Sequence, residues 1–122
     1  MRSSKLLKYL RARGVNDNAY IDFCCNGIIK GEKFELCSIN ELDFVVDHFF
    51  DGSDEIGFGL IQTNEVLNTS AGKLLSIGAI LGDDIICMEI ETGKIMLWLI
   101  QNGDGETVEV ADTFAAFLEA VT

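Results

Sequence analysis

The segment 77–98, IGAILGDDIICMEIETGKIMLW, constrains the fold of this chain more than any other stretch. Residues 85–91 and 94–100 are two runs rich in strand-forming side chains, separated only by Thr92-Gly93. A two-residue segment between such runs, with glycine as its second residue, is typical of a tight hairpin turn. The sequence therefore predicts an antiparallel pair of strands here.

A two-residue turn also fixes the register of the hairpin, because strand side chains alternate between faces. In that register Cys87 pairs with Trp98, and the oppositely charged Glu91 and Lys94 pair beside the turn. One face is mixed in character, and the other is apolar and expected to be buried. The apolar face holds Ile86, Met88, Ile90, Ile95, Leu97 and Leu99.

Helical spacing of apolar residues at the two ends, with alternation between them, predicts an α+β fold with an antiparallel sheet and terminal helices packed on one face. Helices are predicted over 5–13, 17–25 and 113–121, and a capping-box spacing at 38–41 predicts a short helix toward Val46. Strands are predicted over 33–37, 56–62, 73–80 and 106–110, with a turn or short helix at 64–68. The chain of 122 residues fits one domain, 1–122.

Charge is unevenly distributed along the chain, whose formal net charge is −11. Residues 1–13 carry five basic side chains and no acid, whereas residues 14–122 carry all 20 acids against four lysines, a net of −16. A field of this sign repels nucleic acid and anionic membranes and attracts basic proteins. Acidic surfaces also serve solubility, so both alternatives stay open.

Cysteine usage and hydropathy indicate a cytoplasmic protein. No apolar run reaches the roughly 20 residues of a membrane span, and the N-terminus lacks the apolar block of a secretory signal. The cysteines contain no C-x-x-C pair and fit buried thiols in a reducing compartment. They are Cys24, Cys25, Cys37 and Cys87.

The sequence favours no catalytic residue, cofactor or metal ion. The single histidine, His48, is expected near the end of a helix, and the acidic loops 51–57 and 102–108 lack the glycine that a calcium loop needs at its sixth position. Asp83 and Asp84 form an acidic pair that a metal-dependent hydrolase would require. Strand alternation separates their side chains, so we interpret Gly82-Asp83 as a structural corner.

The order of these pieces resembles the SUKH superfamily, the bacterial immunity proteins related to yeast cell-wall-assembly regulators of the Smi and Knr type. The resemblance is carried by 23–27 (FCCNG), 76–78 (SIG), 82–87 (GDDIIC), 92–95 (TGKI), Trp98 and 111–118 (ADTFAAFL). It implies a strongly bent antiparallel sheet, no catalysis, and the neutralisation of partner toxins, often nucleases, by binding. The proline that members usually carry at the second helix is missing, and 44–72 has no clear counterpart.

Together the charge and the resemblance predict an immunity protein that blocks a basic, nuclease-type toxin through an acidic surface. The alternative is a regulatory or scaffold domain in a cell-envelope or signalling assembly. Trp98 either belongs to the partner surface or lies beneath a terminal helix, and the oligomeric state, monomer or weak dimer, stays open. The candidate partner-binding residues are Asp51, Asp54, Glu55, Asp83, Asp84, Asp104, Glu106 and Trp98.

Overall fold

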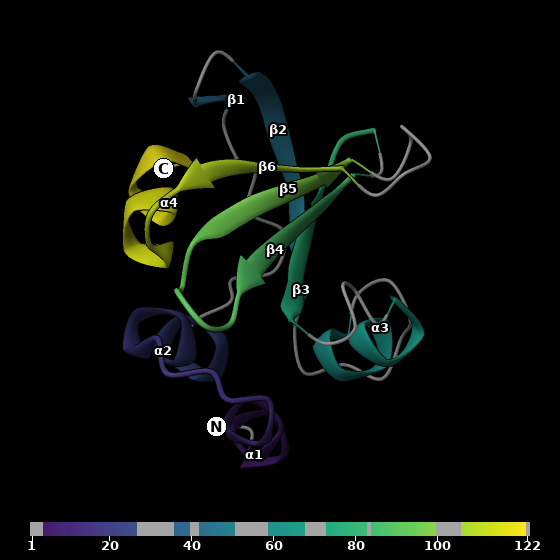
Figure 1. Ribbon diagram of the computed structural model, residues 1–122, viewed down its shortest axis with the longest axis vertical. Coiled ribbons are helices and arrows are strands. Elements are labelled where there is room, and N and C mark those ends of the chain that lie inside the picture. The colour runs from purple at the N-terminus through teal and green to yellow at the C-terminus, as the bar shows by residue number, and fades with distance from the viewer. Residues whose placement is uncertain are drawn as a thin grey trace.

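The computed structural model describes residues 4–26, 36–39, 42–50, 59–67, 73–82, 84–99 and 106–121. Within these residues the architecture is α+β, as predicted, with helices at both ends of an antiparallel sheet (Figure 1). The elements are α1 (Ser4–Ala12), α2 (Asn18–Asn26), β1 (Leu36–Ile39), β2 (Leu42–Phe49), α3 (Leu60–Leu67), β3 (Leu74–Ile80), β4 (Ile85–Glu89), β5 (Ile95–Leu99), β6 (Glu106–Ala111) and α4 (Phe114–Val121).

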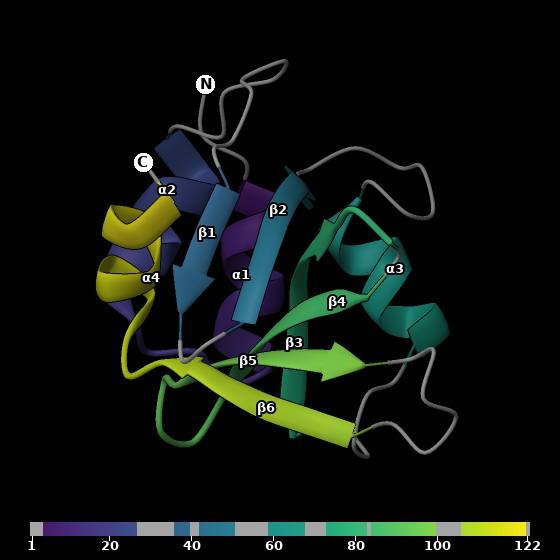
Figure 2. The same cartoon turned by 90° about the horizontal axis from the view of Figure 1, so that it is seen from above.

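The described strands form one open sheet in the order β1-β2-β3-β4-β5-β6, with every neighbouring pair antiparallel. The sheet is strongly bent, so that β1 and β2 cross the direction of β5 and β6 in Figure 2. The register shifts between β2 and β3, between β3 and β4, and between β5 and β6. Such irregularities bend a strand and increase its twist, which explains the curvature.

The helices form one layer against this sheet. α1 contacts α2 and α3, α2 contacts α4, α3 packs on β3, and α4 packs on β1 and β6. In Figure 1 they follow the left and lower sides of the sheet. An aromatic cluster joins the layers: the Tyr20 and Phe114 rings are 5.0 Å apart, and Phe49 lies edge-on to Phe114 and Phe117. The predicted packing of the terminal helices on one face is confirmed.

The two N-terminal helices form where they were predicted. In α1, Leu6 and Leu10 lie one turn apart and are both buried, whereas the lysines of the helix are exposed. The helix ends at Ala12, and Gly14 just beyond it has a φ of 85°, a conformation that glycine adopts without strain. Before α2, the Asp17 carboxylate accepts a hydrogen bond from the Tyr20 backbone N–H at 3.0 Å, as an N-cap residue does.

The predicted helix from Ser38 to Val46 is wrong, because this segment forms the β1–β2 hairpin. Ile39 pairs with Leu42, and β2 continues to Phe49, so His48 lies on a strand and not at a helix end. The aromatic and β-branched run at 44–46 favours a sheet, and pairing with β3 buries Val46. These tertiary contacts outweigh the local capping signal.

The predicted strand over 56–62 is wrong from Leu60 onward, where the chain forms α3. Leu60, Thr63 and Asn64 are buried at helical spacing, and the helix includes most of the segment expected as a turn or short helix. Residues 56–58 lie outside the described part of the chain. A short apolar run does not distinguish a strand from a buried helix segment, which explains the error. The strands predicted over 73–80 and 106–110 are β3 and β6.

The β4–β5 hairpin exists as predicted, but its turn is longer. Glu89 N–H donates to the Lys94 carbonyl at 2.8 Å, and Gly93 N–H donates to the Glu89 carbonyl at 2.7 Å, so residues 90–93 make the turn. Cys87 therefore pairs with Met96 and not with Trp98. A displacement by two residues keeps every side chain on its predicted face.

The ion pair expected beside this turn is also different. Lys94 lies 3.2 Å from the Glu109 carboxylate on β6, across the β5–β6 pair, and Glu91 is not its partner. Of the face that was expected to be buried, Ile86, Met88, Ile95 and Leu97 are buried, whereas Ile90 and Leu99 are only partly covered.

Candidate partner-binding surface

Three of the predicted partner-binding residues meet at one end of the sheet. Asp84 directly precedes β4, Trp98 pairs with Ile85 at the start of β4, and Glu106 pairs with Leu99 at the end of β5. Glu106 is exposed, and Asp84 and Trp98 are partly buried. The strand register thus places Asp84, Trp98 and Glu106 at the same end of three neighbouring strands, with the Trp98 side chain on one face of the sheet and the Glu106 side chain, in the row of Leu99, on the other.

The remaining predicted partner-binding residues lie outside the described part of the chain. They are Asp51, Asp54, Glu55, Asp83 and Asp104. The predicted corner before β4 is described at Gly82, whose φ of 100° is the left-handed conformation that a turn of this kind requires. The Ile80 N–H closes the corner by donating to the Asp84 carbonyl at 3.0 Å.

Trp98 lies on the face of β5 that also carries Met96, opposite the buried Leu97. Across the sheet, exposure on this face increases from β4 to β6: Cys87 is buried, Met96 and Trp98 are half-buried, and Thr107 is exposed. We call Met96, Trp98, Thr107 and Glu109 the β5–β6 surface. Partly exposed Trp and Met beside charged residues are typical of the centre of a protein interface.

Cys87, which lies beside Met96 on the neighbouring strand β4, carries a buried thiol. Burial raises the pKa of the Cys87 thiol to about 12, and the nearby Ser76 hydroxyl, 3.9 Å from the sulfur, only partly offsets this effect. The thiol therefore stays protonated at neutral pH and is a poor nucleophile. This supports a packing role for Cys87.

Sequence reasoning missed the charged group at the turn end of the hairpin. The Glu109 carboxylate, with Asp112 and Glu89 nearby, raises the pKa of the Lys94 ammonium. The Thr92 hydroxyl donates to Glu89 at 2.6 Å. The two glutamates of residues 106–109 were visible in the sequence, but only the β5–β6 register reveals that Glu109 meets Lys94.

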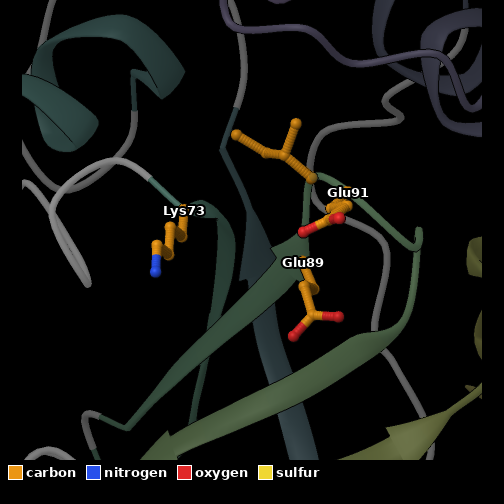
Figure 3. A pocket seen from close by; sticks show the side chains of 4 residues that line it. Lys73, Glu89 and Glu91 are labelled. Carbon is orange, nitrogen blue, oxygen red and sulfur yellow. The ribbon is translucent and has the colours of Figure 1, made fainter.

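Two shallow pockets flank the same turn. One, of about 270 Å³, has Lys73 on one wall and Glu89 and Glu91 on the other (Figure 3). The second, of about 220 Å³, lies toward the start of α2 and includes Asp17 and Gly93. Carboxylates outnumber the cation in these walls, which adds to the acidic character of this end of the hairpin.

No described group of three or more His, Cys, Asp or Glu side chains is arranged to hold a metal ion. His48 lies on β2, where its Nδ1 is 2.7 Å from the carboxylate of its neighbour Asp47 and its ring packs near Phe50. Among the described helices, none has the length and apolarity needed to cross a membrane.

Comparison with known proteins gives one match. A model of the SMI1 / KNR4 family (SUKH-1) matches residues 17–120, which include every described element except α1 and the last residue of α4. No curated protein and no solved structure matches the chain significantly.

Proposed function

The chain belongs to the SMI1 / KNR4 family (SUKH-1), and from this membership we propose that it is an immunity protein that binds and neutralises a partner toxin. The family supports an immunity or Smi1-like protein-interaction module. The toxin as partner, its basic character and the acidic binding surface are our proposal. The proposed activity is binding alone, in the cytoplasm and without a catalytic step.

The observation that carries the proposal is that Asp84, Trp98 and Glu106 lie at the same end of β4, β5 and β6. A nuclease binds its substrate in a basic groove, and carboxylates placed opposite that groove occupy the sites of the phosphates. Trp98, on the other face at the same end of the sheet, supplies apolar contact area that a purely charged surface lacks. Asp51, Asp54, Glu55, Asp83 and Asp104 belong to the proposal as sequence predictions.

Bulk charge supports the same partner. The net charge of −16 on residues 14–122 speeds the association of a basic protein and disfavours nucleic acid as a ligand. Such steering weakens with added salt, because the Debye length shortens to about 8 Å at physiological ionic strength. A salt-dependent association rate is therefore a signature of the proposed mode.

The decisive experiment is co-purification with a toxin-like protein encoded next to this chain, followed by kinetics of the purified pair. We expect Glu106→Lys to weaken binding at least about tenfold and Glu65→Lys, on the exposed face of α3, to change it little. Failure of the neighbouring protein to bind would contradict the immunity role. Binding whose affinity changes neither with salt nor with either substitution would contradict the proposal that the acidic surface binds the toxin. Recovery of an envelope or signalling assembly would favour a regulatory scaffold.

A further inference from the structure

We propose that the outer edge of β6 receives an extended, basic segment of the partner as an additional strand of the sheet. This inference rests on the proposed function and names the binding mode. Within the described residues β6 is the last strand in the order, with β5 as its one strand neighbour. In Figure 2 its outer side faces away from every other labelled element. An edge strand in this position is a template for strand addition.

The direction of the backbone groups follows from the hairpin. Glu89 and Lys94 share an N–H···O bond at 2.8 Å, so they form a hydrogen-bonded pair of the antiparallel ladder. Hydrogen-bonded and non-bonded pairs alternate along such a ladder. Cys87–Met96 is therefore the next hydrogen-bonded pair, and Trp98 lies in the one after it. On β5, these residues direct their backbone groups toward β4.

The intervening residues of β5, Leu97 and Leu99, direct their backbone groups to the other side, toward β6. Their partners there are Val108 and Glu106. Thr107 lies between these two, so its N–H and C=O point away from β5, in the plane of the sheet and toward its outer edge. Thr107 is exposed, which leaves room for the backbone of an incoming strand. The edge thus presents a donor and an acceptor at the position where a new strand would pair.

Charge selects the kind of strand that fits. Glu106 and Asp112 are exposed at the two ends of β6, and the Glu109 side chain is 42% exposed in its pair with Lys94. Opposite charges on neighbouring strands stabilise pairing, whereas like charges destabilise it. A second copy of this chain, with its net charge of −11, would set carboxylates against carboxylates. A segment rich in Lys or Arg is the complementary occupant.

Trp98 makes this occupancy measurable. It pairs with Thr107, so both side chains lie on the β5–β6 surface, and Thr107 is the only side chain between the indole and the outer edge on that row. An arginine opposite Thr107 can reach across this small side chain and stack on the indole. Trp98 is the one tryptophan of the chain, so its fluorescence reports on this site directly.

The test uses the full chain and the peptide acetyl-RVRVRVR-amide, compared with the same peptide N-methylated at alternate residues. Both carry the same charge, but the second cannot complete a ladder. We expect the unmodified peptide to quench the fluorescence of Trp98 and to slow hydrogen exchange of the Thr107 N–H. The Val108 N–H, which faces β5, should exchange slowly with and without peptide. The N-methylated peptide should bind at least about tenfold more weakly.

Several results would overturn the inference. Equal affinity of the two peptides would mean that charge acts without strand addition. No change at Thr107 with peptide at about 1 mM would exclude the edge as the site. Protection of Thr107 that grows with protein concentration, without peptide, would mean that a second copy occupies the edge.

Variants link the edge to the real partner. Thr107→Pro removes the outward N–H and leaves the bonds to β5, and Thr107→Val keeps it. We expect the first to bind the toxin at least about tenfold more weakly than the second. If Thr107→Pro lowers Tm strongly, Thr107→Arg replaces it, with Ala12→Arg on α1 as the matched control. A toxin that binds all these variants equally leaves the proposed function intact and refutes the edge; a toxin that binds none, wild type included, refutes the function.

Discussion

The side-chain amide of Asn64 exchanges two hydrogen bonds with the backbone of Ser76, each at 2.8 Å: its Nδ2 donates to the carbonyl and its Oδ1 accepts from the N–H. Both residues are buried. Within the described residues, the pairing of β2 with β3 runs to Phe49 and Gly78, and the Phe50 N–H donates to the Ile77 carbonyl. Asn64 therefore pairs with the backbone of Ser76 as a strand residue would, and holds α3 against β3.

Replacement of this amide should be costly. Asn64→Leu keeps the volume but leaves a buried N–H and C=O of Ser76 without partners, and we expect a loss of about 2 to 4 kcal/mol in the free energy of unfolding. Glu65→Leu, at the exposed neighbouring position, should change it by less than about 0.5 kcal/mol. Urea titration followed by circular dichroism measures both. Similar values for the two variants would show that the amide is not a structural anchor.

Replacing Gly78 and replacing Gly82 should each lower the free energy of unfolding, but for different reasons. A Cβ on Gly78 would lie 2.7 Å from the His48 carbonyl oxygen, a backbone atom that cannot move without separating β2 from β3. A Cβ on Gly82 would meet no atom within 4 Å, but this residue has a φ of 100°. We expect Gly78→Ala to cost about 3 kcal/mol and Gly82→Ala about 1 to 2 kcal/mol. Asparagine tolerates the left-handed conformation, so Gly82→Asn should recover stability and Gly78→Asn should not. Thermal unfolding distinguishes them.

The buried thiol of Cys87 makes stability depend on alkaline pH. Its pKa is about 12 in the folded chain, against 9.0 for an ordinary cysteine thiol. Above pH 9 the unfolded chain loses this proton and the folded chain keeps it, so stability that is complete below pH 9 is lost as pH rises toward 12. This contributes a slope of about −1.4 kcal/mol per pH unit. Cys87→Ala should lack that contribution. Identical slopes for both proteins between pH 9 and pH 10.5, roughly the range before general alkaline unfolding, would contradict it.

The length of the hairpin turn can be tested by crosslinking. With residues 90–93 in the turn, Cys87 pairs with position 96, so Met96→Cys should form a disulfide with Cys87 on mild oxidation. With a two-residue turn the partner would be position 98. Trp98→Cys is therefore the matched control, and mass spectrometry after thiol alkylation reports each product. A crosslink in the Trp98→Cys variant alone would show that the turn has two residues and not four.

Periodicity predicted the elements whose signal is carried within one segment. The leucines of α1, the Asp17 cap and the apolar alternation of β3, β4 and β5 needed no distant contact, and the faces of the hairpin survived a change in register. The β1–β2 hairpin and α3 were mistaken, because Val46 and Asn64 take their conformations from contacts with β3. For such segments the local signal is weak, and the packing decides.

The sequence predicted which residue types would form the candidate site, but not how they are arranged in space. Acidity singled out Asp84 and Glu106, but their meeting with Trp98 depends on the pairing of three strands, which one sequence does not specify. The ion pair of Lys94 and Glu109 was missed for the same reason. Five of the eight candidate residues lie outside the described part of the chain, and for these the prediction stands as a prediction.

The position of α1 bears on where the cooperative folding unit begins. The family match starts at residue 17, yet Leu6 and Leu10 are fully buried, and Arg13 donates to the Leu74 carbonyl at 3.2 Å and to the Tyr9 hydroxyl at 2.8 Å. Cutting the chain at the family boundary would strip an apolar layer from the core and a donor from the start of β3. The boundary shared with relatives is therefore evolutionary, and the thermodynamic boundary of this chain lies at least one helix earlier.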